Sequence, residues 1–319
     1  MRRLAALALL MVVALPAAHV AAQPVVQEYS VPAGSHPHDV APARDGGVWF
    51  TAQARGYLGW LDPSTGEVRQ TRLGERSAPH GVIVGPDGAP WITDGGQNAI
   101  VRVDPLTSAV QVFPVPSARS ADLNTEAFDR NGSLWFTGQA GFYGRLDPST
   151  GDVQVWDAPR GPGAYGITAT PDGSRVFYAS LAGSHIAEIN LETGLATPID
   201  PPTPRQGARR VWTDSHGVIW VSEWNAGQVG RYDPASGDWR EWKLPGSRPQ
   251  AYAVYVDEQD SVWLSDWGSN AMVRFDPSTE TFQPFAMPEG GAGIRQINGR
   301  GGEVWAAESG LDRLVVIRH

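Results

Sequence analysis

The chain has 319 residues, with 25 lysines and arginines against 34 aspartates and glutamates, and it contains no cysteine. An acidic chain lacks the basic surface that a phosphate backbone requires, so the composition argues against nucleic-acid binding. It favours cations and neutral or basic small molecules as ligands. Without cysteine, no disulfide framework holds the fold.

Residues 1–22 have the pattern of a secretory signal. Arg2 and Arg3 precede an apolar run from Leu4 to Leu15, and small residues follow at positions 20–22. The apolar run is shorter than the ~20 residues that a membrane-spanning helix needs. We therefore expect a secreted or periplasmic protein whose mature chain, residues 23–319, has no membrane span.

The rest of the chain is a repeat. An aromatic residue and an Asp-Pro turn each recur about every 43 residues, which indicates a repeat architecture. The aromatic residues are Trp49, Trp91, Trp135, Phe177, Trp220, Trp263 and Trp305. The turns begin at Asp62, Asp104, Asp147, Asn190, Asp233 and Asp276. We expect the aromatic residues to pack between repeats and the aspartates to form turns.

One repeat, Pro79–Pro116, predicts four short strands joined by turn residues, at 80–85, 90–94, 99–104 and 110–116. This is the pattern of a propeller blade. The last repeat stops after its third strand, at 312–319, while Val25–Pro32 has the pattern of a fourth strand. The sequence thus predicts an all-β, seven-bladed β-propeller in one domain, residues 23–319, with four-stranded blades. The mature N-terminal strand would close the last blade.

Two positions in each blade are expected to face one mouth of the central channel, where propellers commonly bind ligands. They are the start of the first strand and the end of the second. The first set is His38, His80, Asn124, Tyr165, Arg209, Tyr252 and Arg295. The acidic members of the second set are Asp94, Glu223, Asp266 and Glu308. A channel lined by water-solvated polar groups is the alternative interpretation.

Converging carboxylates reduce their mutual repulsion by binding a divalent cation, so Asp94, Glu223, Asp266 and Glu308 predict a Mg²⁺ or Ca²⁺ site. His38 and His80 occupy equivalent positions in adjacent blades and are the candidate catalytic residues, because histidine is the usual general base near neutral pH. The remaining mouth residues, Asn124, Tyr165, Arg209, Tyr252 and Arg295, are predicted to bind substrate.

Two segments, "APHGVIVGPDGAPWITDGGQNAIVRVDP" and "GARRVWTDSHGVIWVSEWNAGQVGRYDP", resemble the virginiamycin B lyase (streptogramin lyase) family. The resemblance implies a seven-bladed, Mg²⁺-dependent propeller that opens cyclic streptogramin B depsipeptides by elimination. By this resemblance, His38 and His80 match the family's histidine pair and Asp94 its second acidic position. Ala78 stands where the family has glutamate, and the blades at the family's own place in the chain carry Arg209, Glu223, Tyr252 and Asp266 instead of histidine.

Three functions remain open from the sequence. The first is an eliminase, a carbon-oxygen lyase in which His80 removes a proton α to a carbonyl and a carboxylate leaves without addition of water. The second is a gluconolactonase-like metal-dependent hydrolase, with Asn124, Glu223, Asp266 and Glu308 as oxygen ligands. The third is a non-catalytic propeller that binds a small molecule or a protein at the same mouth. For all three functions we expect a monomer.

Overall fold

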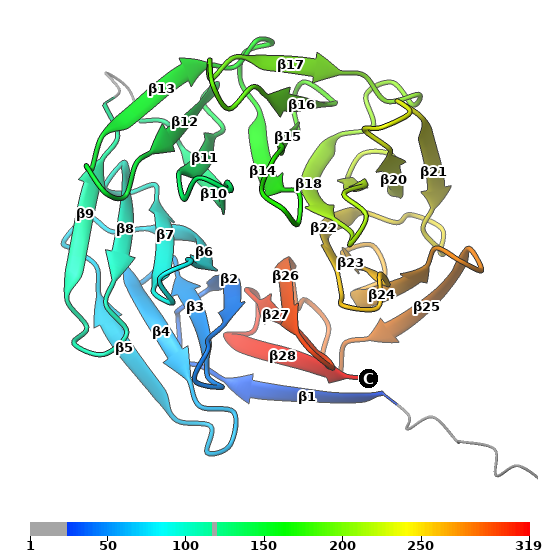
Figure 1. Cartoon of the computed structure of the whole chain (residues 1–319). Coiled ribbons are helices and arrows are strands. Elements are labelled where there is room, and N and C mark those ends of the chain that lie inside the picture. The colour runs from blue at the N-terminus through cyan, green and yellow to red at the C-terminus, as the bar shows by residue number, and fades with distance from the viewer. Residues whose placement is uncertain (1–23, 117–119) are drawn as a thin grey trace, which may run out of the picture.

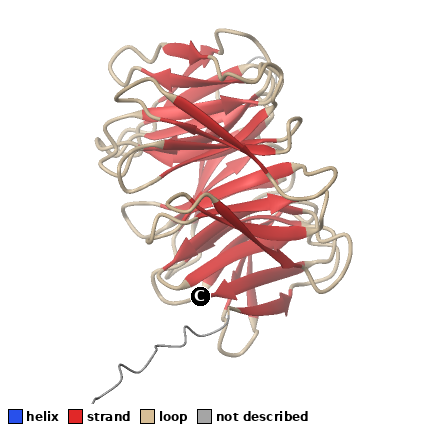
Figure 2. Cartoon of the chain, turned by 90° about the vertical axis from the view of Figure 1, so that its right-hand side faces the viewer, coloured by secondary structure: helices blue, strands red, loops and turns tan. Residues whose placement is uncertain are grey.

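A computed structural model of the chain describes residues 24–116 and 120–319, so the predicted signal at residues 1–22 lies outside the described residues. In the described part the regular structure is β-strand, arranged as seven four-stranded antiparallel sheets around a central axis (Figure 1). Seen from the side, the loops gather on the two flat faces of the disc (Figure 2). The prediction of an all-β, seven-bladed propeller is confirmed.

Each of the first three blades is formed by four consecutive strands, the first of which lies nearest the axis (Figure 1). Blade one comprises β2 (Pro37–Pro42), β3 (Val48–Ala52), β4 (Tyr57–Leu61) and β5 (Val68–Arg72). Blade two comprises β6 (Pro79–Val84), β7 (Pro90–Asp94), β8 (Ala99–Val103) and β9 (Val110–Pro114). Blade three comprises β10 (Leu123–Phe128), β11 (Leu134–Gly138), β12 (Phe142–Leu146) and β13 (Val153–Asp157).

The next three blades repeat this order. Blade four comprises β14 (Ala164–Ala169), β15 (Val176–Ser180), β16 (His185–Ile189) and β17 (Ala196–Ile199). Blade five comprises β18 (Ala208–Thr213), β19 (Ile219–Glu223), β20 (Gln228–Tyr232) and β21 (Trp239–Lys243). Blade six comprises β22 (Ala251–Val256), β23 (Val262–Asp266), β24 (Ala271–Asp276) and β25 (Thr281–Ala286).

The seventh blade joins the two ends of the chain. It contains β26 (Ile294–Arg300), β27 (Glu303–Glu308) and β28 (Arg313–Arg318), and its outer strand is β1 (Val25–Ser30). β1 runs antiparallel to β28, with Val25 opposite Arg318 and Ser30 opposite Arg313. Because β1 covers the free edge of β28, the last blade has the same four strands as the others. The predicted closure is confirmed.

The repeated aromatic residues form the core between blades. All seven are buried, and Trp49 of blade one packs in one cluster with Val82 and Ile92 of blade two. The repeated Asp-Pro segments are exposed turns, in which Oδ1 of Asp62 accepts hydrogen bonds from the backbone nitrogen and hydroxyl of Ser64 at 2.8 and 2.6 Å. Both predicted structural roles are confirmed. In the described residues, no helix is long and apolar enough to cross a membrane.

Candidate functional site

The inner strand of every blade carries a β-bulge at the channel mouth. Between paired positions such as Pro37–Ala52 and Val40–Phe50, the inner strand has one residue more than its neighbour. A bulge changes the direction of side chains and is common beside active sites. In the other six blades the same break falls at Pro79/Val82, Leu123/Glu126, Ala164/Ile167, Ala208/Val211, Ala251/Val254 and Ile294/Ile297. The predicted mouth residues lie within these bulges.

Hydroxyl groups on the second strands hold these bulges in place. Oγ1 of Thr51 accepts a hydrogen bond from the backbone nitrogen of Asp39 at 3.0 Å and donates one to the carbonyl oxygen of His80 at 2.7 Å. It therefore links the bulge of blade one to that of blade two. Equivalent bonds are made by Thr93, Thr137, Ser222 and Ser265. The repeated threonine or serine two positions after the tryptophan thus fixes the backbone around the axis.

His38 and His80 lie against each other at the mouth. Their ring centroids are 3.7 Å apart, and both side chains are buried. Nδ1 of His38 donates a hydrogen bond to Oδ1 of Asp39 at 2.7 Å, which leaves Nε2 as the unprotonated nitrogen of the ring. The amide of Asn124 donates to Nε2 of His80 at 3.2 Å. His38 is therefore the histidine whose basic nitrogen is not engaged by a neighbour among the described residues.

Asp39 connects His38 to a buried arginine on the far side of the axis. The guanidinium of Arg210 donates to both carboxylate oxygens of Asp39, at 2.9 and 3.2 Å. Burial raises the pKa of Asp39, and the charge of Arg210 opposes this rise. Burial lowers the pKa of His38 well below its usual value, and Arg210, Arg295 and Arg209 lower it further. Burial is the main cause that lowers the pKa of His80, and the neighbouring His38 is the second. Both rings are thus neutral at neutral pH.

The other predicted mouth residues continue the ring beyond His80. The Tyr165 ring meets His80 edge-on, with centroids 6.3 Å apart, and its hydroxyl lies 2.5 Å from that of Tyr252. Arg209 donates to the Tyr165 hydroxyl at 2.9 Å, and Arg295 lies over the ring of Trp267. The structure therefore brings His38, His80, Asn124, Tyr165, Tyr252, Arg209 and Arg295 to one mouth, which is where the sequence places them.

The four carboxylates predicted to bind metal do not converge. Asp94 accepts hydrogen bonds from the Ser77 hydroxyl at 2.5 Å and from the backbone nitrogen of Ala78 at 2.9 Å. Asp266 accepts from the backbone nitrogen of Gln250 at 2.7 Å and the Ser269 hydroxyl at 2.5 Å. Both carboxylates therefore hold loops of their own blades together.

Glu223 and Glu308 are buried away from the axis. Oε2 of Glu223 accepts a hydrogen bond from Gln228 at 2.5 Å, and Glu308 lies near Glu28 and Arg313 of the outer strands. Burial, with Glu241, raises the pKa of Glu223 to about 8. Burial, with Glu28, raises that of Glu308 to about 7. Among the described residues these four carboxylates do not form a group with the spacing of metal ligands, so one metal site formed by them stays a prediction.

Within the described residues, one different group has the spacing of metal ligands. The ligand atoms of His38, Asp39 and His80 all lie within 4.8 Å of one another, and all three residues are buried. This group could bind a metal ion. Two imidazoles and one carboxylate form a donor set typical of transition metals, whereas Mg²⁺ prefers oxygen ligands throughout.

Sequence reasoning missed Asp39, Arg210 and Glu126. Each follows a predicted mouth residue by one or two positions, and the bulge turns them toward the axis below the histidines. They border a cavity of about 30 Å³, about the share of one water molecule in the liquid. Burial, followed by the charge of Asp39, raises the pKa of Glu126 well above its usual value. Asp39 and Arg210 could have been found in the sequence as charged residues directly after a predicted mouth residue, as in "HD" at 38–39 and "RR" at 209–210.

A seven-bladed propeller with a histidine pair at its channel mouth is the class of protein that the fold and the site define. Residues 24–314 match the Virginiamycin B lyase family, and the chain belongs to that family. A comparison with curated proteins finds no match.

Solved structures show the same architecture. Virginiamycin B lyase from Staphylococcus aureus matches with a TM-score of 0.85 and 20% identity, over 93% of this chain and 100% of that one. The same values hold for its catalytically inactive histidine-to-alanine variant with quinupristin. A streptogramin B lyase matches with a TM-score of 0.84 and 22% identity, over 92% and 97% of the two chains. Hydrazine synthase from Kuenenia stuttgartiensis matches with a TM-score of 0.73 and 13% identity, over 90% and 97%. At these identities the likeness establishes the fold.

Proposed function

We propose that the protein is an exported carbon-oxygen lyase that opens a cyclic ester or depsipeptide of the streptogramin B type, or a related small molecule, by elimination at the channel mouth. The observation that carries the proposal is the buried pair of His38 and His80, whose ring centroids lie 3.7 Å apart. A hydrogen bond to Asp39 orients the ring of His38. Family membership and the structure of a relative with quinupristin support the same substrate class.

The chemistry requires a neutral base beside the ester. Nε2 of His38 takes a proton from the carbon α to a carbonyl. The neighbouring β carbon carries the ester oxygen. The electron pair of the broken C–H bond forms a carbon-carbon double bond, and the C–O bond breaks. The acyl half leaves as a carboxylate, and no water is added. Asp39 stabilises the imidazolium that forms on His38, as a carboxylate does for the histidine of a catalytic triad.

His38 replaces His80 as the preferred base. The sequence made His80 the candidate base, but Asn124 donates to the basic nitrogen of that ring. His80 is better placed to position His38 against the substrate, since its ring packs against both His38 and Tyr165. Asn124, Tyr165 and Tyr252 complete the wall along which a substrate would lie.

The Mg²⁺ that the family resemblance implies does not fit these residues. The predicted oxygen ligands are dispersed among their own blades, and the only carboxylate in the buried group, Asp39, is already bound by Arg210. Arg209, Arg210 and Arg295 also place positive charge around His38. The hydrolase alternative, which needs Asn124, Glu223, Asp266 and Glu308 around one ion, has no support here, because the Asn124 amide bonds His80 and the carboxylates of Glu223 and Asp266 bond donors of their own blades.

A product analysis tests this function. The chain from residue 23 is incubated with a streptogramin B, with and without Mg²⁺ and with a chelator, and the product's mass and ultraviolet spectrum are recorded. Elimination gives an isomer of unchanged mass with a new conjugated double bond. Addition of one water would instead show a hydrolase, and an unchanged compound would favour a binding propeller. His216 is an exposed histidine far along the chain from His38 and His80. The variant His216→Ala is therefore the control for nonspecific effects of losing a histidine.

A further inference from the structure

Two arginines at the channel mouth have no acidic partner. Arg209 makes one hydrogen bond, to the Tyr165 hydroxyl at 2.9 Å, and its Nε is buried without a partner. Arg295 contacts the ring of Trp267, with its guanidinium carbon 5.4 Å from the ring centroid. In the ranges 24–116 and 120–319, neither guanidinium forms an ion pair. Arg210, by contrast, forms an ion pair with Asp39 through two hydrogen bonds.

An aromatic stack separates the two arginines. The rings of Tyr252 and Trp267 are stacked, with centroids 5.0 Å apart and an interplanar angle of 16°. The guanidinium carbon of Arg209 lies 3.5 Å from the Tyr252 centroid, and Arg295 lies over Trp267. Trp224 meets both rings edge-on and also contacts Arg209. Stacking holds a guanidinium parallel to the ring below it. The stack therefore orients the N–H donors of Arg209 and Arg295.

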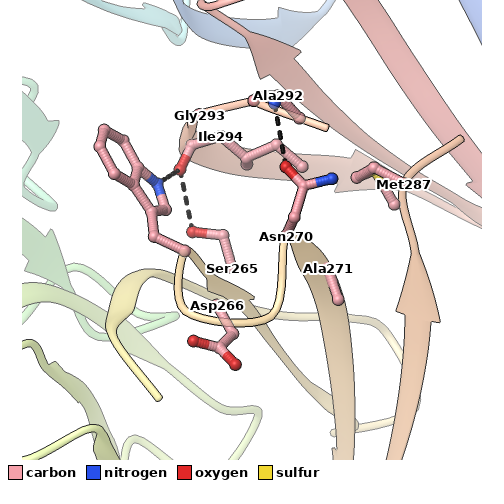
Figure 3. Close-up of a pocket in the computed structure, with 10 residues that line it drawn as sticks. Ser265, Asp266, Asn270, Ala271, Met287, Ala292, Gly293 and Ile294 are labelled. Carbon is pink, nitrogen blue, oxygen red and sulfur yellow. Dashed lines mark hydrogen bonds between the residues drawn. The ribbon is translucent and has the colours of Figure 1, made fainter. Parts of the chain in front are cut away.

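Hydrogen bonds hold the stack rigid. The indole nitrogen of Trp267 donates to the carbonyl oxygen of Ile294 at 2.6 Å, and the Ser265 hydroxyl donates to the same oxygen at 3.0 Å. Figure 3 shows Ser265 and Ile294 meeting in this way, beside the bond from the Ala292 backbone to the Asn270 side chain. The loop before β26 is thereby tied to blade six, so the site is built before any ligand arrives.

Open space lies beside this stack. A cavity of about 490 Å³ is lined by Trp267, Arg295, His36, Gln53 and Ser309. The pocket of Figure 3, of about 240 Å³, also includes Trp267 in its lining. Cavities of this size accept part or all of a small organic ligand. Arg295 and the aromatic face therefore adjoin a space that a ligand can enter.

The local charge is opposite to that of the whole chain. His38 and His80 are neutral, Asp39 is paired with Arg210, and the carboxylate of Asp266 is saturated by donors of its own loop. Arg209 and Arg295 are left as uncompensated positive charges. The effect reaches Tyr252, because burial acts to raise its pKa but the charges of Arg209 and Arg210 more than offset this and lower it. The composition-based expectation of cationic, neutral or basic ligands is not what the mouth favours.

We infer that Arg209 and Arg295, on the Tyr252–Trp267 stack, form a subsite for a carboxylate carried on a flat or apolar group. The inference rests on the proposed function for its location, since it takes the ligand to bind at the mouth that holds the histidines. It adds a role for the subsite, because elimination at an ester releases a carboxylate. Two guanidinium groups beside the base would stabilise that leaving group as its charge develops.

Benzoate and benzamide are matched probes for this subsite, because they differ in charge and share a shape. We expect calorimetry on the chain from residue 23 to show benzoate binding roughly 10- to 100-fold tighter than benzamide. Arg209→Gln and Arg295→Gln should each remove most of that preference. Arg69→Gln is the control, because Arg69 also lies over an indole, 3.7 Å from the Trp60 centroid, but on the outer strand β5. Arg209→Lys keeps the charge and should retain part of the preference, even if the glutamine variant unfolds.

Equal affinity for the two probes, or no benzoate binding up to about 100 mM, corresponding to a free energy weaker than roughly 1.4 kcal/mol, would overturn the subsite. So would full benzoate affinity in a folded double variant of Arg209 and Arg295. The readout is independent of turnover. Benzoate binding by a protein that leaves cyclic esters intact would contradict the proposed function alone. Isomer formation without any benzoate preference would contradict the subsite alone.

Discussion

Asp39 of blade one and Arg210 of blade five meet below the channel mouth, where two hydrogen bonds of 2.9 and 3.2 Å join side chains 171 positions apart. Both are buried, and Asp39 also accepts the Nδ1 proton of His38. A buried ion pair contributes little net stability when intact but is costly to break. Its function here is to hold an ionised carboxylate behind the base.

Asp39→Asn should therefore impair catalysis more than substrate binding. The amide no longer orients the His38 tautomer or stabilises its charged form, so we expect kcat to fall by about 10²–10⁴-fold with a smaller change in KM. Steady-state kinetics on the variant, below its melting temperature, measure this effect. The variant should also lose about 3–5 kcal/mol of stability, because Arg210 remains buried without its partner. A variant with unchanged kcat would show that Asp39 has only a structural role.

The pH dependence of the rate follows from the lowered histidine pKa. A base whose pKa is lowered stays neutral at more acidic pH, so we expect the rate to hold as pH falls through the ordinary histidine value of about 6.5 and to decline only below it. Burial is the main cause of this shift, and the charges of Arg210, Arg295 and Arg209 add to it. Arg210→Met removes a positive charge and should move the acidic limb to higher pH. A profile of kcat/KM against pH for both proteins provides the measurement, and an acidic limb that does not move would refute the assigned cause.

The fold was predictable because its signals repeat. The aromatic residue at the position of Trp49 packs between neighbouring blades in each repeat. The turn at Asp62 recurs in the same way, with the aspartate oxygen accepting bonds from the turn residues. The mouth ring was predictable for the same reason, since His38 and His80 hold equivalent positions. The local hydrogen bonds of Asp94 and Glu223 were not predictable, because spacing along a strand shows how far a residue lies along the blade but not which neighbouring donors its carboxylate meets.

The charge of the site was not predictable from composition. A net charge of −9 averages over the surface, whereas the mouth collects arginines from blades five and seven. The bulge also leaves no mark in the hydrophobic pattern, because it adds a single residue per inner strand. For that reason Asp39, which a regular strand would direct away from His38, was not recognised as its partner.

The hydroxyl link between blades predicts a defined effect of Thr51→Val. Valine has nearly the same shape but cannot accept from the Asp39 nitrogen or donate to the His80 carbonyl. Two buried backbone groups lose their partner, so we expect a loss of about 2–4 kcal/mol in the free energy of unfolding. Denaturant titration measures it, with Thr65→Val in an exposed turn as the control. Equal stabilities of the two variants would mean that the link contributes nothing.

Glu223 should make the protein less stable as pH rises. Its pKa of about 8 in the folded chain lies above the value of about 4.3 of an unperturbed glutamate, so the folded state keeps a proton that the unfolded state has released. Stability from this proton is present below the unfolded value and is lost as pH rises toward the folded value. Glu223→Gln should flatten the fall in melting temperature between about pH 5 and pH 8.5. Glu67→Gln, at an exposed position, should leave that slope as it is.

The most direct test of the central claim is the rate of isomer formation from a streptogramin B by His38→Ala, measured with and without added imidazole. We predict a fall in kcat/KM of about 10²–10⁴-fold, because the positioned base is lost. Free imidazole should restore part of the rate by entering the space beside His80. His216→Ala should match the unaltered protein. A His38→Ala protein that forms the isomer at the original rate would contradict the assignment of this histidine as the base.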